Sequence, residues 1–401
     1  MFRAVATFAV LALNSNFARA AGPPTRPLTF WHKDNATRPF IDKVAAEFSA
    51  QTGRTVTVEL IGVDQYKTSL LKMGLEKTLP DMALVPSDFV GLHQFLRLSP
   101  VPPSVIDAPL ANAMLETARA AGKLYGVPVI AGNHLVLYYN KRFVATPAGN
   151  WEELRGQAPE LRKQGVKPIG WNYAEMYWFA PFVQAFGGKF LKGRVVTLAT
   201  PEMAEALAFY RQLADDGIID KACTYDCNAK RFLAGEFAYA INGDWAFQEA
   251  HKALGENLGI AALPRIGKRA MPAQFGTQSL VFPEQGLAGP NHDIMVRFAR
   301  FLTSAAVQTR FFTEAERIPV HPKAIAAATA AATGSLKSLI TQMAEAKVMP
   351  SEPEMAYAWE GMRRGFARYM GGKLTPEATA KIMQQAAEEE RKNASKLLDK
   401  K

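Results

Sequence analysis

Aromatic and acidic side chains occur together in three segments of this 401-residue chain. Trp245 lies just past a strand-like run and a glycine turn, and Trp359 lies just after a proline-rich stretch. Tyr177 and Trp178 follow Glu175 in a segment that we expect to be a loop. A pyranose ring has an apolar face and a rim of hydroxyl groups, so flat aromatic side chains and carboxylate acceptors bind it. These segments are therefore candidates for a carbohydrate site, although an isolated Trp more commonly fills a core.

The remaining residues give little support for catalysis. The six histidines are scattered, and none has the H-E-x-x-H spacing of a zinc protease. The sequence contains no G-x-S-x-G elbow, no P-loop and no G-x-G-x-x-G fingerprint. A secreted carbohydrate-active enzyme stays open as an alternative, because any long chain can bring two carboxylates together across a substrate. We expect a protein that is not an enzyme, with no catalytic residue, no metal site and no cofactor.

The two cysteines, Cys223 and Cys227, are separated by three residues. In an oxidising compartment this spacing predicts a disulfide that closes a small loop. Two thiolates with no histidine nearby would make a poor zinc site. We expect the bridge to hold a turn in place.

The first 20 residues have the pattern of a secretory signal. Arg3 precedes an apolar run from Ala4 to Leu13, and Ala18 and Ala20 supply the small residues of a cleavage site. The run is too short to cross a bilayer, which needs about 20 residues. We expect cleavage after Ala20 and a mature protein in the periplasm.

The rest of the chain is long for one hydrophobic core, since chains beyond about 250–300 residues usually divide into domains. Its composition, 48% hydrophobic and 21% charged, is typical of a globular protein. The net charge is +10, two units of which come from arginines in the signal. Lysine and arginine are spread along the chain without a basic cluster, so we expect no nucleic-acid binding.

Strand and helix patterns alternate along the chain, which predicts an α/β fold with parallel strands and crossover helices. The expected strands are residues 28–31, 55–61, 82–85, 135–139, 167–170, 237–241 and 258–263. Helices are expected to begin at Pro39, Trp151 and Pro201, the last with Thr200 as its cap. No flexible linker separates the regions, which indicates that the chain crosses between lobes more than once.

Five blocks of sequence carry a resemblance to a known family. They are GKLYGVP at residues 122–128, LYYNK at 137–141, NWEEL at 150–154, FLAGEFAYAINGDW at 232–245, and the C-terminal block 349–363. In this order and spacing they resemble the extracellular solute-binding proteins of the maltose/maltodextrin-binding type. The resemblance covers most of the chain, from Leu28 to about Ala387.

The resemblance implies a two-lobed periplasmic-binding-protein fold with the ligand between the lobes and several hinge crossings. The first lobe would comprise residues 22–132 plus 277–328, and the second residues 136–273 plus 333–401. Binding would close the hinge. The implied function is a monomeric receptor that delivers a disaccharide or oligosaccharide to the membrane permease of an ABC importer.

The resemblance also implies which residues contact the ligand. The matched positions are Asp88 and Glu175 as acceptors, Tyr177, Trp245 and Trp359 as aromatic contacts, and Arg363 near them. Three further candidates match less closely: Asn133, shifted by one residue, stands where a glutamate is usual, and Asp34 and Asn35, with Lys33, lie where an acidic and a basic residue are usual. Phe89 replaces an arginine, and the tryptophan expected near Val85 is absent. A ligand other than maltose is therefore compatible with the sequence.

Two further interpretations stay open. A receptor for a charged solute, such as a phosphonate, a polyamine or a ferric ion, would gather charged groups or paired tyrosines at its site. A sensor that presents its bound form to a chemoreceptor or kinase would have the same sequence features as a transport receptor.

Overall fold

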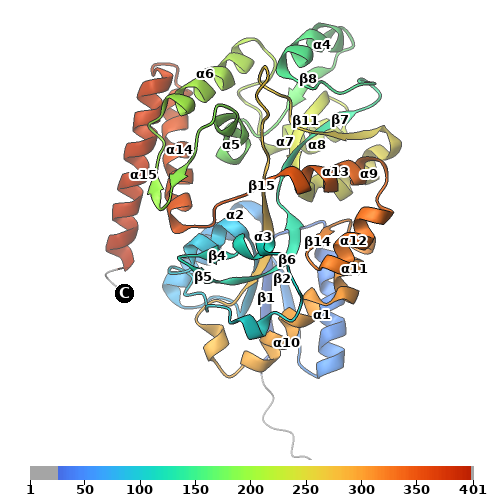
Figure 1. The fold of residues 1–401 in the computed structure, drawn as a ribbon, viewed down its shortest axis with the longest axis vertical. Helices are drawn as coiled ribbons and strands as arrows, with labels where there is room; N and C mark the ends of the chain where they lie inside the picture. Colours follow the sequence, from blue (N-terminus) through green and yellow to red (C-terminus); the bar gives the residue numbers. More distant parts are fainter. Residues whose placement is uncertain (1–25, 399–401) are drawn as a thin grey trace, which may run out of the picture.

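Two β-sheets organise residues 26–398, which are the residues described by this computed structural model (Figure 1). The predicted signal and its cleavage after Ala20 fall outside the described residues. In the view of Figure 1 the first sheet lies below and the second above. The fold is α/β with two lobes, and the alternating pattern predicted the α/β class. The expectation of parallel strands was wrong in part, because β13 (Gln274–Val281) in the first sheet and β7 (Leu135–Asn140) in the second run antiparallel to the strands on either side of them. The predicted lobe boundaries themselves stay a prediction.

The first sheet has the strand order β14-β6-β13-β3-β1-β2. Its strands are β1 (Leu28–His32), β2 (Val56–Leu60), β3 (Met82–Pro86), β6 (Gly126–Gly132), β13 (Gln274–Val281) and β14 (Ile318–Pro319). β1 is parallel to β2 and β3, whereas β13 is antiparallel to β3 and β6. Every residue of β3 and β6 is buried, because helices or loops cover both faces.

Helices surround this sheet, namely α1 (Arg38–Thr52), α2 (Val63–Glu76), α3 (Asn112–Glu116), α10 (His292–Thr303), α11 (Ala305–Ala315) and α12 (Pro322–Ala331). α1 buries Phe40, Val44 and Phe48, the face that its spacing predicted. Gly53 ends α1 with φ +69°, a left-handed conformation that glycine adopts readily. A short antiparallel pair, β4 (Arg119–Ala120) with β5 (Lys123–Leu124), lies beside the sheet.

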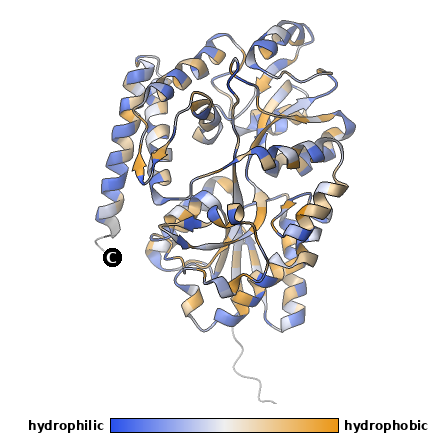
Figure 2. Cartoon of the chain, in the orientation of Figure 1, coloured by the Kyte–Doolittle hydropathy of each residue, from blue (hydrophilic) through white to orange (hydrophobic). Residues whose placement is uncertain are grey.

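The second sheet has the order β12-β7-β11-β8. Its strands are β7 (Leu135–Asn140), β8 (Lys167–Gly170), β11 (Phe237–Gly243) and β12 (Leu258–Ala261). The surrounding elements are α4 (Trp151–Lys163), α5 (Met176–Ala185), α6 (Pro201–Asp215), α7 (Tyr225–Asn228), α8 (Lys230–Leu233), α9 (Phe247–Leu254), α13 (Gly334–Glu345), α14 (Pro353–Tyr369), α15 (Pro376–Leu398) and the hairpin β9 (Leu191–Lys192) with β10 (Val195–Val196). The helices around both sheets alternate apolar and hydrophilic residues along their length (Figure 2). They therefore bury one face each.

The chain passes between the sheets at several places. β6 leads directly into β7: the strand ends at Gly132, with φ +131°, and Asn133, with φ +49°, follows in the turn. β12 is followed by β13, and α12 by α13. β15 (Lys347–Val348) then pairs with the start of β13 before the chain enters α14. Because the chain crosses repeatedly, each sheet is built from separate stretches of sequence.

One local expectation was wrong. Tyr177 and Trp178 do not lie in a loop but in the first turn of α5. The side chain of Glu175 caps this helix by accepting a hydrogen bond from the backbone N–H of Tyr177, at 3.4 Å. Among the described helices, none combines the length and the apolar character that crossing a bilayer requires.

Candidate functional site

Tyr177 lies at the centre of an aromatic group that three separate segments build. Its ring centroid is 6.2 Å from that of Trp245 and 6.1 Å from that of Trp359. Tyr177 comes from α5, Trp245 from the 3-10 turn Asp244–Ala246 after β11, and Trp359 from α14. All three side chains are half-buried. The structure therefore brings together the three aromatic residues that the sequence singled out.

The indole of Trp245 is held on its face and on its edge. A Cβ atom added to Gly243 would lie 2.0 Å from the indole, so the ring rests directly on this glycine. The indole N–H donates a hydrogen bond to the hydroxyl of Tyr225, at 3.1 Å. Trp178 meets the indole edge-on, with ring centroids 6.1 Å apart. These contacts restrict the orientations that the half-buried ring can adopt.

Trp359 also packs against Tyr177. Its ring centroid is 5.8 Å from that of Phe190, and its indole nitrogen is buried without a hydrogen-bond partner among the described residues. Arg363 lies one turn further along α14, exposed, where it makes two hydrogen bonds with Glu360 at 2.7 and 2.8 Å. The guanidinium of Arg363 is therefore held by Glu360, the residue that follows Trp359 on α14.

The hydroxyl of Tyr177 connects this group to the turn between the sheets. It donates a hydrogen bond to the backbone carbonyl of Asn133. The side chain of Asn133 lies near Gly276 of β13, as does the hydroxyl of Ser87. That hydroxyl is buried without a partner among the described residues. Asn133 thus lies beside the aromatic group, where its side chain and Ser87 offer polar atoms.

Two carboxylates, one from each lobe, approach the aromatic group. Asp88 lies in the 3-10 helix η1 (Ser87–Leu92) after β3, and burial raises the pKa of its carboxyl, an effect that Lys67 and Lys33 partly oppose. Burial also raises the pKa of Glu175, and the hydrogen bonds that its carboxylate accepts from the backbone N–H groups of Tyr177 and Met176 oppose the shift. Lys67 acts on both carboxylates, which places all three groups in one electrostatic neighbourhood.

The segment after β1 carries Lys33, Asp34 and Asn35. Burial lowers the pKa of the half-buried Lys33 ammonium, while Asp88 and Asp34 oppose the shift. The carboxylate of Asp34 accepts hydrogen bonds from the guanidinium of Arg317 and from the backbone N–H of Ala36. Asn35 is exposed. Lys33 is therefore available near Asp88, whereas Asp34 is already engaged by protein groups.

Arg317 is a residue that the sequence analysis missed. It lies just before β14, is 3% exposed, and reaches Asp34 of the first lobe and Asp244, which precedes Trp245. One guanidinium N–H donates to the backbone carbonyl of Asp244 at 3.2 Å. Burial works against its charge, yet Asp34 and Asp244 hold the pKa of Arg317 above its usual value. No local pattern around Arg317 indicates this role, since both partners are distant in sequence.

Asp244 is also attached to the turn between the sheets. Its carboxylate accepts a hydrogen bond from the backbone N–H of His134 at 3.1 Å, and its own N–H donates to the carbonyl of His134, also at 3.1 Å. Burial lowers the pKa of His134, against the effect of Asp244. Arg317 therefore links the first lobe to the turn that carries Trp245.

The predicted disulfide is present. Cys223 and Cys227 are joined across a Cα–Cα distance of 5.6 Å, and both are buried. The bridge encloses Tyr225, the partner of Trp245. Sequence reasoning did not single out Tyr225, although its position between the two cysteines was visible.

A pocket of about 750 Å³ lies elsewhere between the lobes. Its lining includes His93, Tyr125, Arg194, Tyr357 and Arg391, and none of the residues predicted as ligand contacts. Its charged groups are mixed, because Glu354 pairs with Arg194 within it. It selects no single class of ligand.

Two similar proteins are described by the sugars that they bind. The chain is 21% identical over 357 residues to a maltodextrin-binding protein of Bacillus subtilis, covering 85% of this chain and 84% of the relative. A solved maltose/maltodextrin-binding domain from Bdellovibrio bacteriovorus, bound to maltotriose, is 25% identical with a TM-score of 0.82, covering 92% of this chain and 100% of that one.

A second solved structure has the same fold. The GacH receptor of Streptomyces glaucescens, solved unliganded and with acarbose, is 20% identical with a TM-score of 0.81 over 90% of this chain and 97% of that one. The family model described as bacterial extracellular solute-binding protein matches residues 43–337, well over half of the sequence. The chain therefore belongs to the bacterial extracellular solute-binding proteins.

Proposed function

We propose that this protein is a periplasmic receptor that captures a disaccharide or oligosaccharide and presents it to the permease of an ABC importer, without catalysing a reaction. The observation that carries the proposal is the convergence of Trp245 and Trp359 on Tyr177 from three segments distant in sequence, with ring centroids 6.2 and 6.1 Å from that of Tyr177. The maltodextrin-binding relative and the maltotriose-bound structure support a sugar as the ligand.

The chemistry of binding follows from the groups around these rings. The apolar face of a sugar ring would lie on Trp245 and Trp359, while its hydroxyl groups donate to Asp88 and Glu175. Asp88 belongs to the first lobe and Glu175 to the second, so a bound sugar would join both lobes. A ligand that contacts both lobes favours the closed conformer by its extra contacts there.

Trp359→Ala tests the proposal. We expect the free energy of sugar binding to weaken by at least about 1 kcal/mol, or roughly fivefold in affinity, because the sugar ring loses the indole of Trp359 as a stacking surface. Isothermal titration calorimetry against maltose, maltotriose and longer maltodextrins measures it. Tyr357→Ala is the matched control, since Tyr357 is a half-buried aromatic residue on the same helix that lines the other pocket; it should bind sugar as the wild type does.

The same panel separates the other functions. If a phosphonate, a polyamine or a ferric ion binds and no sugar does, the site serves a charged solute and the proposal is wrong. If the wild type cuts oligosaccharides to give new reducing ends, and Glu175→Gln does not, the protein is an enzyme. Unchanged sugar affinity in Trp359→Ala would remove Trp359 from the site.

A further inference from the structure

The disulfide loop contacts two of the three segments that carry the predicted second-lobe ligand contacts, namely the segment before α5 and the turn with Trp245. The carbonyl of Cys223 accepts a hydrogen bond from the backbone N–H of Tyr173 at 3.0 Å, two residues before Glu175. Both sulfur atoms point inward, since Cys223 and Cys227 are 3% and 2% exposed. Tyr225, between them, is 39% exposed. The bridge thus buries both ends of a short loop and leaves its tyrosine at the surface.

Tyr225 is in direct contact with the aromatic group. Its hydroxyl accepts the indole N–H of Trp245 at 3.1 Å, and its ring meets Trp178 edge-on at 6.1 Å. Gly243 lies under the face of the same indole. Of these contacts, the hydrogen bond with Tyr225 is the one that fixes the direction of the indole edge, because a hydrogen bond is directional and a flat contact is not.

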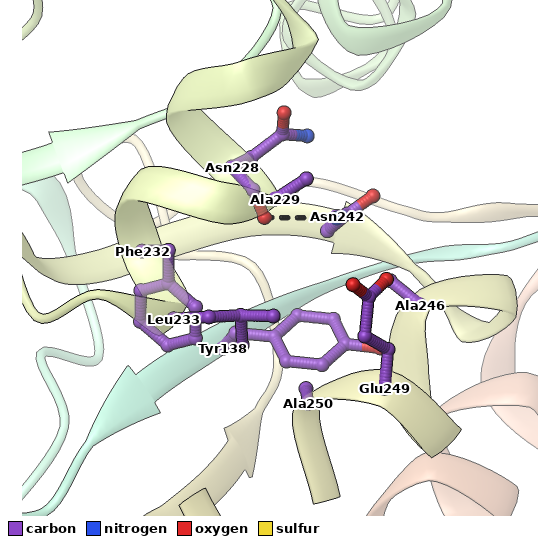
Figure 3. Close-up of a pocket in the computed structure, with 9 residues that line it drawn as sticks. All are labelled: Tyr138, Asn228, Ala229, Phe232, Leu233, Asn242, Ala246, Glu249 and Ala250. Carbon is purple, nitrogen blue, oxygen red and sulfur yellow. Dashed lines mark hydrogen bonds between the residues drawn. The ribbon is translucent and has the colours of Figure 1, made fainter. Parts of the chain in front are cut away.

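The loop is also attached to β11, the strand that leads to Trp245. The side chain of Asn228 donates to the carbonyl of Ile241, and the side chain of Asn242 donates to the carbonyl of Asn228, each at 2.9 Å. Figure 3 shows the second of these hydrogen bonds, between Asn242 at the end of β11 and Asn228 beside Ala229. These two hydrogen bonds therefore fix the position of α7 relative to β11, the strand that leads to Trp245.

A helix of four residues such as α7 does not persist by its own backbone hydrogen bonds, because helix nucleation is unfavourable. A bridge across so short a loop restrains the unfolded chain less than a bridge across a long one. Its effect on global stability is accordingly smaller than that of a long-loop disulfide. Its local effect is to keep Tyr225 facing Trp245.

We propose that the Cys223–Cys227 disulfide is a positioning element of the sugar site: it holds the Tyr225 hydroxyl against the Trp245 indole and so presets the stacking surface. The inference rests on the proposed function for its consequence in binding. The bridge thus affects ligand affinity through the contact of Tyr225 with Trp245.

A double-mutant cycle tests this chain of contacts. The four proteins are wild type, Tyr225→Phe, Cys223→Ser with Cys227→Ser, and the combination, each titrated with maltotriose. Losing one directional hydrogen bond should weaken binding by about three- to tenfold. In the Tyr225→Phe background, removing the disulfide should cost less than about twofold more, since the contact it supports is already gone. Full additivity, or wild-type affinity without the disulfide, would overturn the inference.

A readout without ligand keeps the test independent of the sugar. The protein is labelled with 5-fluorotryptophan, and the ¹⁹F resonance of Trp245 is assigned by its loss in Trp245→Phe. This resonance should shift or broaden both in Tyr225→Phe and in the variant that lacks the disulfide. An unchanged resonance in the folded Tyr225→Phe protein would also overturn the inference, even if the serine variant failed to fold. If wild type binds no sugar while the resonance shifts as expected, the proposed function fails and the positioning role stands.

Discussion

At the scale of single residues, the site combines carboxylates that the protein makes weaker acids. Burial raises the pKa of Asp88 and of Glu175. Only the ionised carboxylate is a strong, acceptor-only group for sugar hydroxyls. Between the ordinary carboxyl pKa and the raised one, the folded protein binds more protons than the unfolded chain, so these two groups lower stability as the pH rises through that window.

Sugar affinity should therefore fall on acidification before ordinary carboxyls titrate. Titrations from about pH 7.5 down to about pH 5 should show weakening that begins above the usual carboxyl pKa of about 4. Asp88→Asn should bind more weakly at neutral pH and show a shallower pH dependence, because one of the two titrating groups is gone. An affinity that stays constant over this range would contradict a role for ionised Asp88 and Glu175.

The sequence could predict the residue types of the site but not all of their partners. Trp245 and Trp359 stand out because tryptophan is rare and each follows a turn signal. Asp34, by contrast, meets Arg317, which lies 283 residues later. Such an ion pair is created by the tertiary fold, and no periodicity or spacing in the sequence predicts it. Tyr225 had a local signal, its place between two cysteines, which only the structure connects to Trp245.

At the scale of elements, α14 and α15 pack closely because glycines on α14 leave no side chain in the way. A Cβ at Gly361 would lie 2.5 Å from the carbonyl oxygen of Met383 and 2.7 Å from the Cβ of Ala387. These are backbone and Cβ atoms, which cannot swing aside as a long side chain can. α14 carries Trp359, so its placement against α15 also places the indole.

Gly361→Ala should lower the free energy of unfolding by about 1–3 kcal/mol through overpacking, measured by urea denaturation. The control is Gly156→Ala in α4, where an added Cβ meets no atom within 4 Å. There the higher helix propensity of alanine should raise stability by up to about 1 kcal/mol. Equal effects at the two glycines would show that close packing of α14 on α15 does not matter.

Element prediction succeeded where a start signal and a buried face agree. α6 begins at Pro201 with the Thr200 hydroxyl accepting the N–H of Met203, as the sequence predicted. α2 was not predicted: it begins after Gly62 without a side-chain cap. The start of α5 was assigned to a loop because a capping glutamate is a weaker signal than Ser, Thr, Asp or Asn.

At the scale of the whole molecule, Arg317 joins the two lobes at their crossing. It is one charge placed between Asp34 and Asp244 and almost removed from water. Removing one partner of a buried ion pair leaves the others uncompensated, which typically costs about 3–5 kcal/mol. The turn that carries Trp245 would lose its attachment to the first lobe in the same step.

Arg317→Met should therefore lower the free energy of unfolding by about 3–5 kcal/mol, and adding Asp244→Asn should recover part of this loss. Denaturation curves of the single and double variants measure both effects. Arg364→Met is the control, because its pair with Glu389 is far more exposed and should contribute less than about 1 kcal/mol. A small effect of Arg317→Met, comparable to that of the control, would contradict the account.

Because the chain crosses repeatedly between its sheets, neighbouring strands of the first sheet are not synthesised one after another. β13 lies between β6 and β3 in the first sheet, yet all four strands of the second sheet (β7, β8, β11 and β12) leave the ribosome after β6 and before β13. At about 5–20 residues per second, the gap between β6 and β13 lasts on the order of ten seconds. During that interval the nascent first sheet has an open centre, with two strand edges unpaired. Export before translation ends, or a chaperone that covers these edges, would keep such a chain from pairing with another copy of itself.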